Sequence, residues 1–226
     1  MNDDLMNRSE LYKAIIDWFE KNMPVAESEL EFRSPYELLV AVILSAQCTD
    51  KRVNLVTEEL FKRYPVPEDL AMAVPADVFR YISSVTYPNN KSKHLVNMAK
   101  VLVNDFNSVV PSDPVLLQRL PGVGRKTANV VASIIYGKPV IAVDTHVYRI
   151  SRRLGLSFKK TPLGVEMDLT ENIPSEKRAI AHHWLILHGR YVCVARNPKC
   201  SYCGLKEYCL HYHVHGSADF HEGSSS

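Results

Sequence analysis

The chain has 226 residues with a hydrophobic content of 46% and a charged content of 23%, ordinary values for a globular protein of one large or two small domains. No apolar run reaches the roughly 18 residues that a bilayer-spanning helix needs, and the acidic start Met1-Asn2-Asp3-Asp4 lacks the apolar core of a secretory signal. These features argue against a membrane or secreted protein and predict a cytoplasmic one.

The net charge of +2 is unevenly distributed along the chain. Residues 1–112 carry a net charge of −4, residues 113–210 carry +8, and residues 211–226 carry −2. A basic segment of this kind is typical of a surface that binds a polyanion, although an uneven solvated surface gives the same count. Charge alone leaves these two interpretations equally open.

The first half of the chain has helical patterning. Apolar residues at helical spacing predict an amphipathic helix over residues 9–22. The sequence Ser34-Pro35-Tyr36-Glu37 places a cap, a first-turn proline and a capping-box acid before the apolar run 38–44, which predicts a second helix. Residues 51–64 and 91–106 follow the same pattern, and prolines separate these segments.

The second half is also predicted to be helical. We expect a short helical segment over 114–120 and helices over 125–136, 145–154 and 175–191, with Gly137 and Gly155 as stops. The best candidate for a strand is Val140–Val143, which is short enough to be a buried loop. The predicted fold class is therefore all-α. From His211 the chain is rich in histidine and ends in Gly-Ser-Ser-Ser, so a disordered tail is expected.

Four cysteines lie close together in the last part of the chain, with the spacing C-x6-C-x2-C-x5-C. The 192 residues before them contain only Cys48. Such crowding in a cytoplasmic chain favours one metal or iron–sulfur site over disulfides, and a structural zinc site stays open as an alternative. The candidate ligands are Cys193, Cys200, Cys203 and Cys209.

A glycine-containing turn precedes the predicted helix at 125–136. In Pro121-Gly122-Val123-Gly124 the two glycines allow a sharp turn and the close approach of another chain. Backbone amides at the start of the next helix favour an anion, so the turn suits a DNA phosphate without reading any base. A tight turn without a ligand would look similar, but the Arg125-Lys126-Thr127 that follows in the basic segment favours the phosphate site.

Lys126 and Asp144 are candidate catalytic residues. Lys126 would lie in the first turn of a helix, where the positive helix end and Arg125 disfavour the ammonium form and leave some neutral amine able to form a Schiff base. Asp144 follows an apolar stretch, and its local sequence favours a helix cap. The catalytic alternative is that Asp144 takes a proton from the amine or stabilises positive charge on a sugar ring.

Three segments follow one another along the chain, and their order and spacing carry a family resemblance. They are Leu120–Val131, Val143–Arg149, and the cysteine loop with the preceding His182–Arg190. Together they resemble the endonuclease III family of helix-hairpin-helix base-excision DNA glycosylases, from about residue 9 to residue 212. The resemblance implies a six-helix domain at 28–138 that ends in the helix-hairpin-helix. It also implies a [4Fe–4S] cluster domain made of 1–27 and 139–212, a cleft between the two domains, and a tail at 213–226.

The same resemblance implies an activity. The chain would be a bifunctional DNA glycosylase and abasic-site lyase that removes oxidised pyrimidines from double-stranded DNA and nicks the strand by β-elimination. Lys126 would be the nucleophile, Asp144 its catalytic partner, and the four cysteines the cluster ligands. The protein would act as a monomer in the cytoplasm, on the nucleoid if the source is bacterial, with no membrane partner.

The resemblance also implies contacts with DNA. Gln47 would fill the space left by the flipped nucleotide. The second intercalating position, often a leucine after a glycine in the family, is here Thr86-Tyr87-Pro88, so Tyr87 or the Pro88 ring would lie beside the opposite base. The remaining expected DNA contacts are Gly122, Gly124, Arg125, Thr127, His146, Arg149, Arg196 and Lys199.

Two other functions remain as alternatives. Mismatch-specific adenine or thymine glycosylases of the same superfamily commonly lack the lysine that this chain has at Lys126. A non-catalytic iron–sulfur DNA-binding module would need neither Lys126 nor Asp144. The effect of replacing Lys126 therefore separates an enzyme from a binding module.

Overall fold

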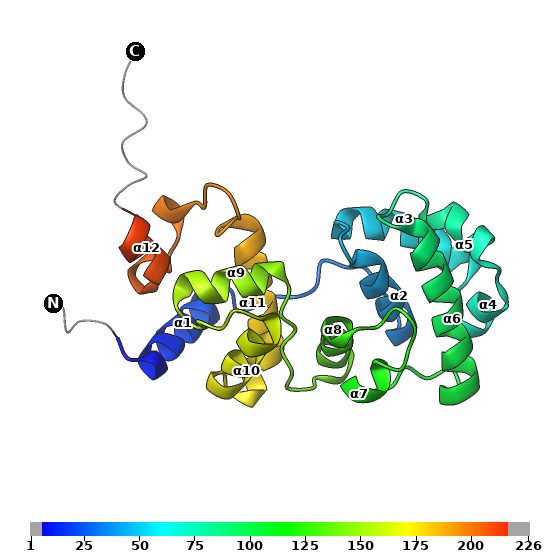
Figure 1. Cartoon of the computed structure of the whole chain (residues 1–226), viewed down its shortest axis with the longest axis horizontal. Coiled ribbons are helices and arrows are strands. Elements are labelled where there is room, and N and C mark those ends of the chain that lie inside the picture. Colours follow the sequence, from blue (N-terminus) through cyan, green and yellow to red (C-terminus); the bar gives the residue numbers. More distant parts are fainter. Residues whose placement is uncertain (1–5, 217–226) are drawn as a thin grey trace, which may run out of the picture. The chain divides into compact units, whose positions relative to one another are not determined.

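The computed structural model describes residues 6–216, and this part of the chain contains α-helices and 3₁₀ turns but no β-strand (Figure 1). The fold is all-α, as expected. The chain divides into two compact units: residues 28–138 form one, and the residues before 28 together with those after 138 form the other. None of the described helices has the length and apolarity to cross a membrane.

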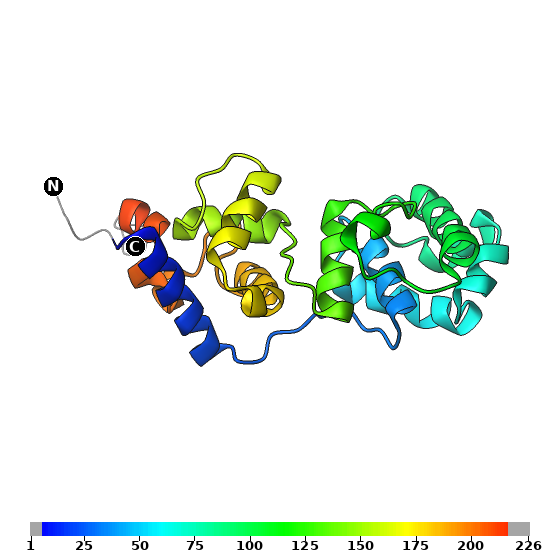
Figure 2. The ribbon, with the colours of Figure 1, turned by 90° about the horizontal axis from the view of Figure 1, so that it is seen from below.

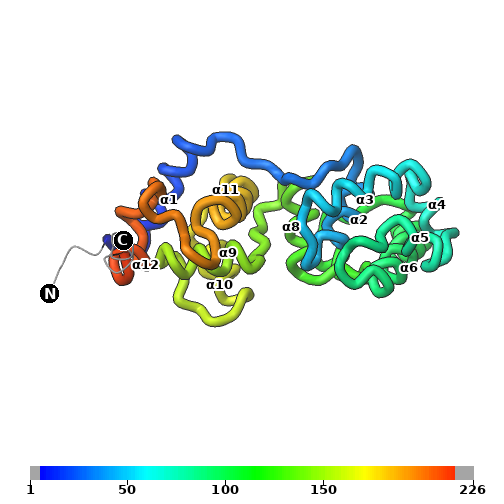
Figure 3. The backbone as a smooth tube through the Cα atoms, turned by 90° about the horizontal axis from the view of Figure 1, so that it is seen from above, coloured from blue at the N-terminus to red at the C-terminus, as the bar shows by residue number. Residues whose placement is uncertain are grey.

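The unit 28–138 is built around helix α2, whose residues 36–44 are all buried. Because α2 is apolar on every side, it must be surrounded, and α3, α6 and α8 pack against it (Figure 3). The helices of this unit are α2 (Pro35–Ser45), α3 (Asp50–Arg63), α4 (Pro67–Met72), α5 (Pro75–Ile82), α6 (Pro88–Phe106), the single turn α7 (Pro114–Leu117) and α8 (Arg125–Tyr136).

The start of α2 follows the predicted signal only in part. Ser34 caps the helix, since its Oγ accepts the Glu37 N–H at 3.2 Å. Glu37 does not complete a capping box with Ser34; its carboxylate accepts the Arg33 N–H at 2.7 Å and pairs with the Arg33 guanidinium at 2.9 Å. Because the Arg33 guanidinium attracts it, the Glu37 carboxylate bonds to the backbone N–H of Arg33 and not to that of the N-cap residue Ser34.

The other unit packs α1 (Arg8–Asn22) against the C-terminal helices (Figure 2). The rings of Phe19 and Trp184 stack in its core with centroids 5.5 Å apart. The predicted strand candidate at 140–143 is a buried loop. The remaining elements are α9 (Thr145–Leu154), α10 (Pro162–Asn172), η1 (Ser175–Lys177), α11 (Arg178–Tyr191), η2 (Cys200–Tyr202), η3 (Lys206–Tyr208) and α12 (Leu210–His215).

The expected disordered tail needs a correction. Helix α12 continues through His215 and packs against α9 and η3, so residues 213–215 are helical. Contacts with folded neighbours stabilise a segment whose polar composition alone predicts no structure. The rest of the expected tail, residues 217–226, lies outside the described residues, as do residues 1–5.

Candidate functional site

The turn between α7 and α8 contains two glycines with different roles. Gly122 has φ +83°, and a Cβ added there would lie 3.0 Å from the Cβ of His94. Gly124 has an ordinary φ of −90°, and a Cβ added there would meet nothing within 4 Å. The fold therefore requires Gly122, whereas the open space at Gly124 is where an outside backbone can approach.

Lys126 lies in the first turn of α8, immediately after this hairpin. The N-cap of α8 is Gly124, so no side chain caps the helix. The amides of the first turn and the helix dipole therefore form a positively polarised end. Arg125 and Lys126 are exposed there, and Thr127 is half-buried. The predicted phosphate-binding residues and the predicted nucleophile thus share one helix start.

Asp144 caps α9, as its local sequence predicts. Its Oδ1 accepts the Val147 N–H at 2.8 Å. The loop before it is buried, and the ring of His182 lies 2.9 Å from the Ala142 carbonyl through Nδ1. His182, which begins the segment His182–Arg190 but had no predicted role, helps to hold this loop. The capping bond uses one of the acceptor sites of the carboxylate and leaves the others open, so the catalytic interpretation of Asp144 stays a prediction.

Two predicted DNA contacts on α9 have partners inside the protein. Arg149 donates to the Gly189 carbonyl at 2.8 Å and to the Cys193 carbonyl at 3.0 Å. Its Nη2 also lies 3.3 Å from Nδ1 of His146. Burial lowers the pKa of Arg149 from its ordinary value. The side chain therefore holds the end of α11, and its expected contact with DNA stays a prediction.

The four predicted ligand cysteines line one cavity. It lies between the end of α11, η2 and the start of α12, and none of the four forms a disulfide. Burial raises the pKa of Cys203 to about 11 and also raises that of Cys209. Such thiols ionise when a metal takes the charge. Among residues 6–216, no three His, Cys, Asp or Glu are arranged to hold a single metal ion. Four thiols around one cavity are a ligand set for a [4Fe–4S] cluster, in which each iron takes one cysteine, and also for a structural zinc ion.

Neighbouring side chains hold the cysteine loop. Arg153 donates to the Val194 carbonyl at 2.7 Å and to the Ala195 carbonyl at 2.9 Å. His188 is buried, which lowers its pKa to about 4, and its Nε2 lies 3.4 Å from Sγ of Cys203. Sequence reasoning missed Arg153, and it included His188 in the segment His182–Arg190 without giving it a role. The only local signal was the spacing of Arg149 and Arg153, which places them on one face of α9.

Arg196 and Lys199 lie in the loop between the first two cysteines and are exposed. The loop turns at Asn197, whose φ is +51°, and the Lys199 N–H donates to the Val192 carbonyl at 3.0 Å. This bond closes the loop. Both cations project from it into solvent, as a contact with a phosphate backbone would require.

The two predicted intercalating residues lie on exposed loops of the unit 28–138. Gln47 lies just after the end of α2, and Tyr87 stands at the N-cap position of α6 without a side-chain capping bond. Tyr87 is 61% exposed, so its ring is available to an outside partner. Cys48, beside Gln47, is a half-buried free thiol.

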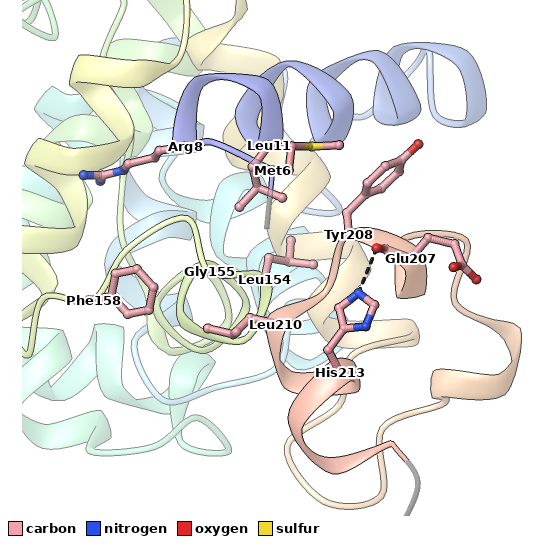
Figure 4. Close-up of a pocket in the computed structure, with 10 residues that line it drawn as sticks. All are labelled: Met6, Arg8, Leu11, Leu154, Gly155, Phe158, Glu207, Tyr208, Leu210 and His213. Carbon is pink, nitrogen blue, oxygen red and sulfur yellow. Dashed lines mark hydrogen bonds between the residues drawn. The ribbon is translucent and has the colours of Figure 1, made fainter. Parts of the chain in front are cut away.

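A second cavity lies next to the cysteine loop (Figure 4). It has a volume of about 360 Å³ and lies between α1, the end of α9 and the segment from η3 to α12. His213 borders it and its ring lies 2.9 Å from the Glu207 carbonyl through Nε2. None of the predicted site residues lines this cavity, so it is not a candidate for the reaction site.

Several known proteins are similar to this chain. Residues 40–175 match the model of the HhH-GPD superfamily of base excision DNA repair proteins. An endonuclease III of Rickettsia conorii is 45% identical over 205 residues, 91% of this chain and 98% of that protein. An endonuclease III of Bacillus subtilis is 48% identical over 188 residues, 82% of this chain and 85% of that protein. A solved structure of a trapped endonuclease III–DNA covalent intermediate matches with a TM-score of 0.89 and 42% identity, covering 93% of this chain and all of that one.

Proposed function

The chain belongs to the endonuclease III family within the HhH-GPD superfamily of base excision DNA repair proteins, and we propose that it performs that family's reaction with Lys126 and Asp144 as its catalytic residues. It is a DNA glycosylase and abasic-site lyase of base excision repair. The position of Lys126 supports its assignment as the nucleophile. Lys126 is exposed in the first turn of α8, which has no side-chain cap and directly follows the glycine hairpin.

In the proposed reaction the Nζ of Lys126 attacks C1′ of a flipped nucleotide. The N–C1′ bond forms as the glycosidic bond breaks, and the base leaves with its electron pair and a proton. The sugar ring opens to a Schiff base on the lysine. Loss of a proton from C2′ then expels the 3′ phosphate by β-elimination, and water hydrolyses the imine to release Lys126. A solved relative is a trapped covalent intermediate with DNA, which supports a covalent route.

Asp144 has two tasks in this proposal. Its Oδ1 caps α9 through the Val147 N–H, which fixes the carboxylate at the helix start. The negative charge then stabilises positive charge on the sugar or accepts the proton that the attacking amine loses. A carboxylate held by its own helix needs no reorganisation when charge develops.

In this proposal the protein binds the DNA backbone by electrostatic contacts. The amides of the hairpin at Gly122 and Gly124 would bind a phosphate, with Arg125 and Thr127 beside them. Arg196 and Lys199, exposed on the cysteine loop, would bind the backbone elsewhere. A [4Fe–4S] cluster bound by the four cysteines would serve as the scaffold that keeps this loop rigid. We propose oxidised pyrimidines or an abasic site in duplex DNA as the substrate, bound by a monomer in the cytoplasm.

A mismatch-specific glycosylase and a non-catalytic iron–sulfur module are the alternatives. Both predict that Lys126 forms no bond to DNA. Borohydride reduction during incubation with an abasic duplex separates them, because it converts a Schiff base into a stable protein–DNA crosslink. We expect the wild-type chain and Lys13→Gln, which changes an exposed lysine on α1, to crosslink and to nick.

Lys126→Gln should lose both crosslinking and nicking while keeping its affinity for the duplex. Full nicking by Lys126→Gln would remove the proposed mechanism. A panel of duplexes with different oxidised pyrimidines would then rank the substrates of the wild-type chain.

A further inference from the structure

Two loops of the unit 28–138 each hold a non-glycine residue in the left-handed conformation. Gln47 and Tyr87 both have φ +55°. Side chains rarely adopt this conformation, and it persists where the surroundings hold it. Both residues are exposed, so neither is held by the packing of its own side chain in the core.

A hydrogen bond joins the two loops. The Oγ1 of Thr86 donates to the carbonyl oxygen of Gln47 at 2.6 Å, although the residues are 39 positions apart in sequence. Thr86 immediately precedes Tyr87, so the bond connects the backbone of one exposed residue to the neighbour of the other. A shift of either loop would break it.

Lys91 makes a second connection between the same loops. It is only 5% exposed, and its Nζ donates to the carbonyls of Leu44 and Ala46, both at 2.7 Å. The ammonium therefore satisfies the end of α2 just before Gln47. The Lys91 N–H also donates to the Tyr87 carbonyl at 3.1 Å in the first turn of α6. Burial lowers the pKa of Lys91. Its three hydrogen bonds connect the two loops.

We propose that Thr86 is a positioning residue, whose bond to Gln47 makes Gln47 and Tyr87 enter the duplex together as one preformed wedge. This proposal rests on the proposed function, since it concerns the step that extrudes the target nucleotide. Loops already tied in place lose less conformational freedom when they insert between stacked bases.

The test compares one lesion in two settings. The first duplex carries thymine glycol opposite adenine, where the nucleotide must be unstacked and unpaired. The second carries the same lesion opposite a mismatched thymine, where pairing is already lost and extrusion is easier. Single-turnover excision is measured on both with enzyme in excess. Thr86→Val removes the hydroxyl at nearly constant volume, and Thr86→Ala does so with less bulk.

We expect Thr86→Val and Thr86→Ala to slow excision by about fivefold to tenfold on the paired duplex, the effect of one lost hydrogen bond, and by less than about twofold on the unpaired one. Thr86→Ser should restore the wild-type rate on both. Thr57→Val is the matched control, because within residues 6–216 the Thr57 hydroxyl bonds only to carbonyls of its own helix α3. It should leave the ratio of the two rates unchanged.

An equal loss on both duplexes, no loss on either, or failure of Thr86→Ser to restore the rate would each overturn the proposal. These outcomes are distinct from failure of the proposed function. If the wild-type chain excises the lesion from neither duplex, the proposed glycosylase activity is wrong, and so is the proposed coupling of Gln47 and Tyr87. An active wild type alongside an unaffected Thr86→Val overturns only the coupling.

Discussion

The Nη1 of Arg153 lies 3.4 Å from the Sγ of Cys193, and the same nitrogen donates to the Val194 carbonyl at 2.7 Å. The backbone carbonyl of Arg153 in turn lies 3.4 Å from the Sγ of Cys209. One residue of α9 therefore contacts the first and the last of the four cysteines. Residues that orient metal ligands without binding the metal commonly tune its retention.

Arg153→Met should weaken retention of the proposed cluster. Methionine keeps the apolar stem but removes the donors that hold the loop at 193–195, so the cysteines become less well placed. We expect several-fold faster loss of iron to a chelator than from the wild-type chain. Iron and acid-labile sulfide per chain measure it. Arg152→Met is the control, since Arg152 donates to the Lys159 carbonyl at 2.7 Å. Equal retention in both variants would contradict the prediction.

Asp144→Asn should separate capping from catalysis. Asparagine caps a helix about as well as aspartate, so the free energy of unfolding should change by less than about 0.5 kcal/mol. Loss of the charge should still slow excision by about 100-fold or more. Urea unfolding and single-turnover kinetics measure the two effects.

Two further substitutions at this position complete the comparison. Asp144→Ala removes both the cap and the charge, so it should lose about 1 kcal/mol of stability as well as activity. Asp144→Ser should regain the stability but not the rate. Wild-type kinetics in Asp144→Asn would mean that the residue only caps α9.

Local signals explain which helices the sequence predicts best. The bounds of α8 and α9 agree with the expected 125–136 and 145–154, because glycine ends each helix in the left-handed conformation, with φ +59° at Gly137 and +85° at Gly155. Helix α10 was not predicted, although Thr161 caps it and Pro162 begins it. Leu163 and Met167 are exposed in it, which weakens the apolar stripe that sequence patterning relies on.

Long-range contacts account for the part of the site that sequence patterning misses. The cysteines are visible in the sequence because they lie close together along it. The bonds of Arg153 to residues 194 and 195 span more than 40 positions, and the Thr86–Gln47 bond spans 39. No spacing rule reaches across such intervals. Helix α12 was missed for a related reason, since its neighbours rather than its histidine-rich composition stabilise it.

Low pH should weaken the ion pair between Arg8 at the start of α1 and Asp168 in α10. Asp168 is buried, and burial alone would raise its pKa, but hydrogen bonds from Ser157 at 2.6 Å and Arg8 at 3.0 Å lower the pKa below its ordinary value. A lowered folded-state pKa contributes stability above the unfolded pKa of about 3.9, and that contribution is lost as the pH falls through the folded-state value. Asp168→Asn should therefore cost about 1–3 kcal/mol at pH 7.

The difference between the two chains should shrink below about pH 4, as the wild-type carboxyl becomes protonated. Urea unfolding of both chains at pH 7, 5 and 3 measures it, and the comparison cancels the titration of every other carboxyl. A difference that stays constant down to pH 3, or grows, would contradict the assigned sign.

Alanine at the two hairpin glycines should separate folding from DNA binding. Gly122→Ala places a Cβ 3.0 Å from His94 in a residue with φ +83°, so it should lose about 1–2 kcal/mol of stability. Gly124→Ala meets nothing within 4 Å and has φ −90°, so its stability should be unchanged. Its methyl group would occupy the open space that a phosphate enters, so duplex affinity should fall about tenfold, as measured by fluorescence anisotropy at fixed salt. A Gly124→Ala chain that binds DNA as well as the wild type would show that the hairpin does not bind the backbone at this point.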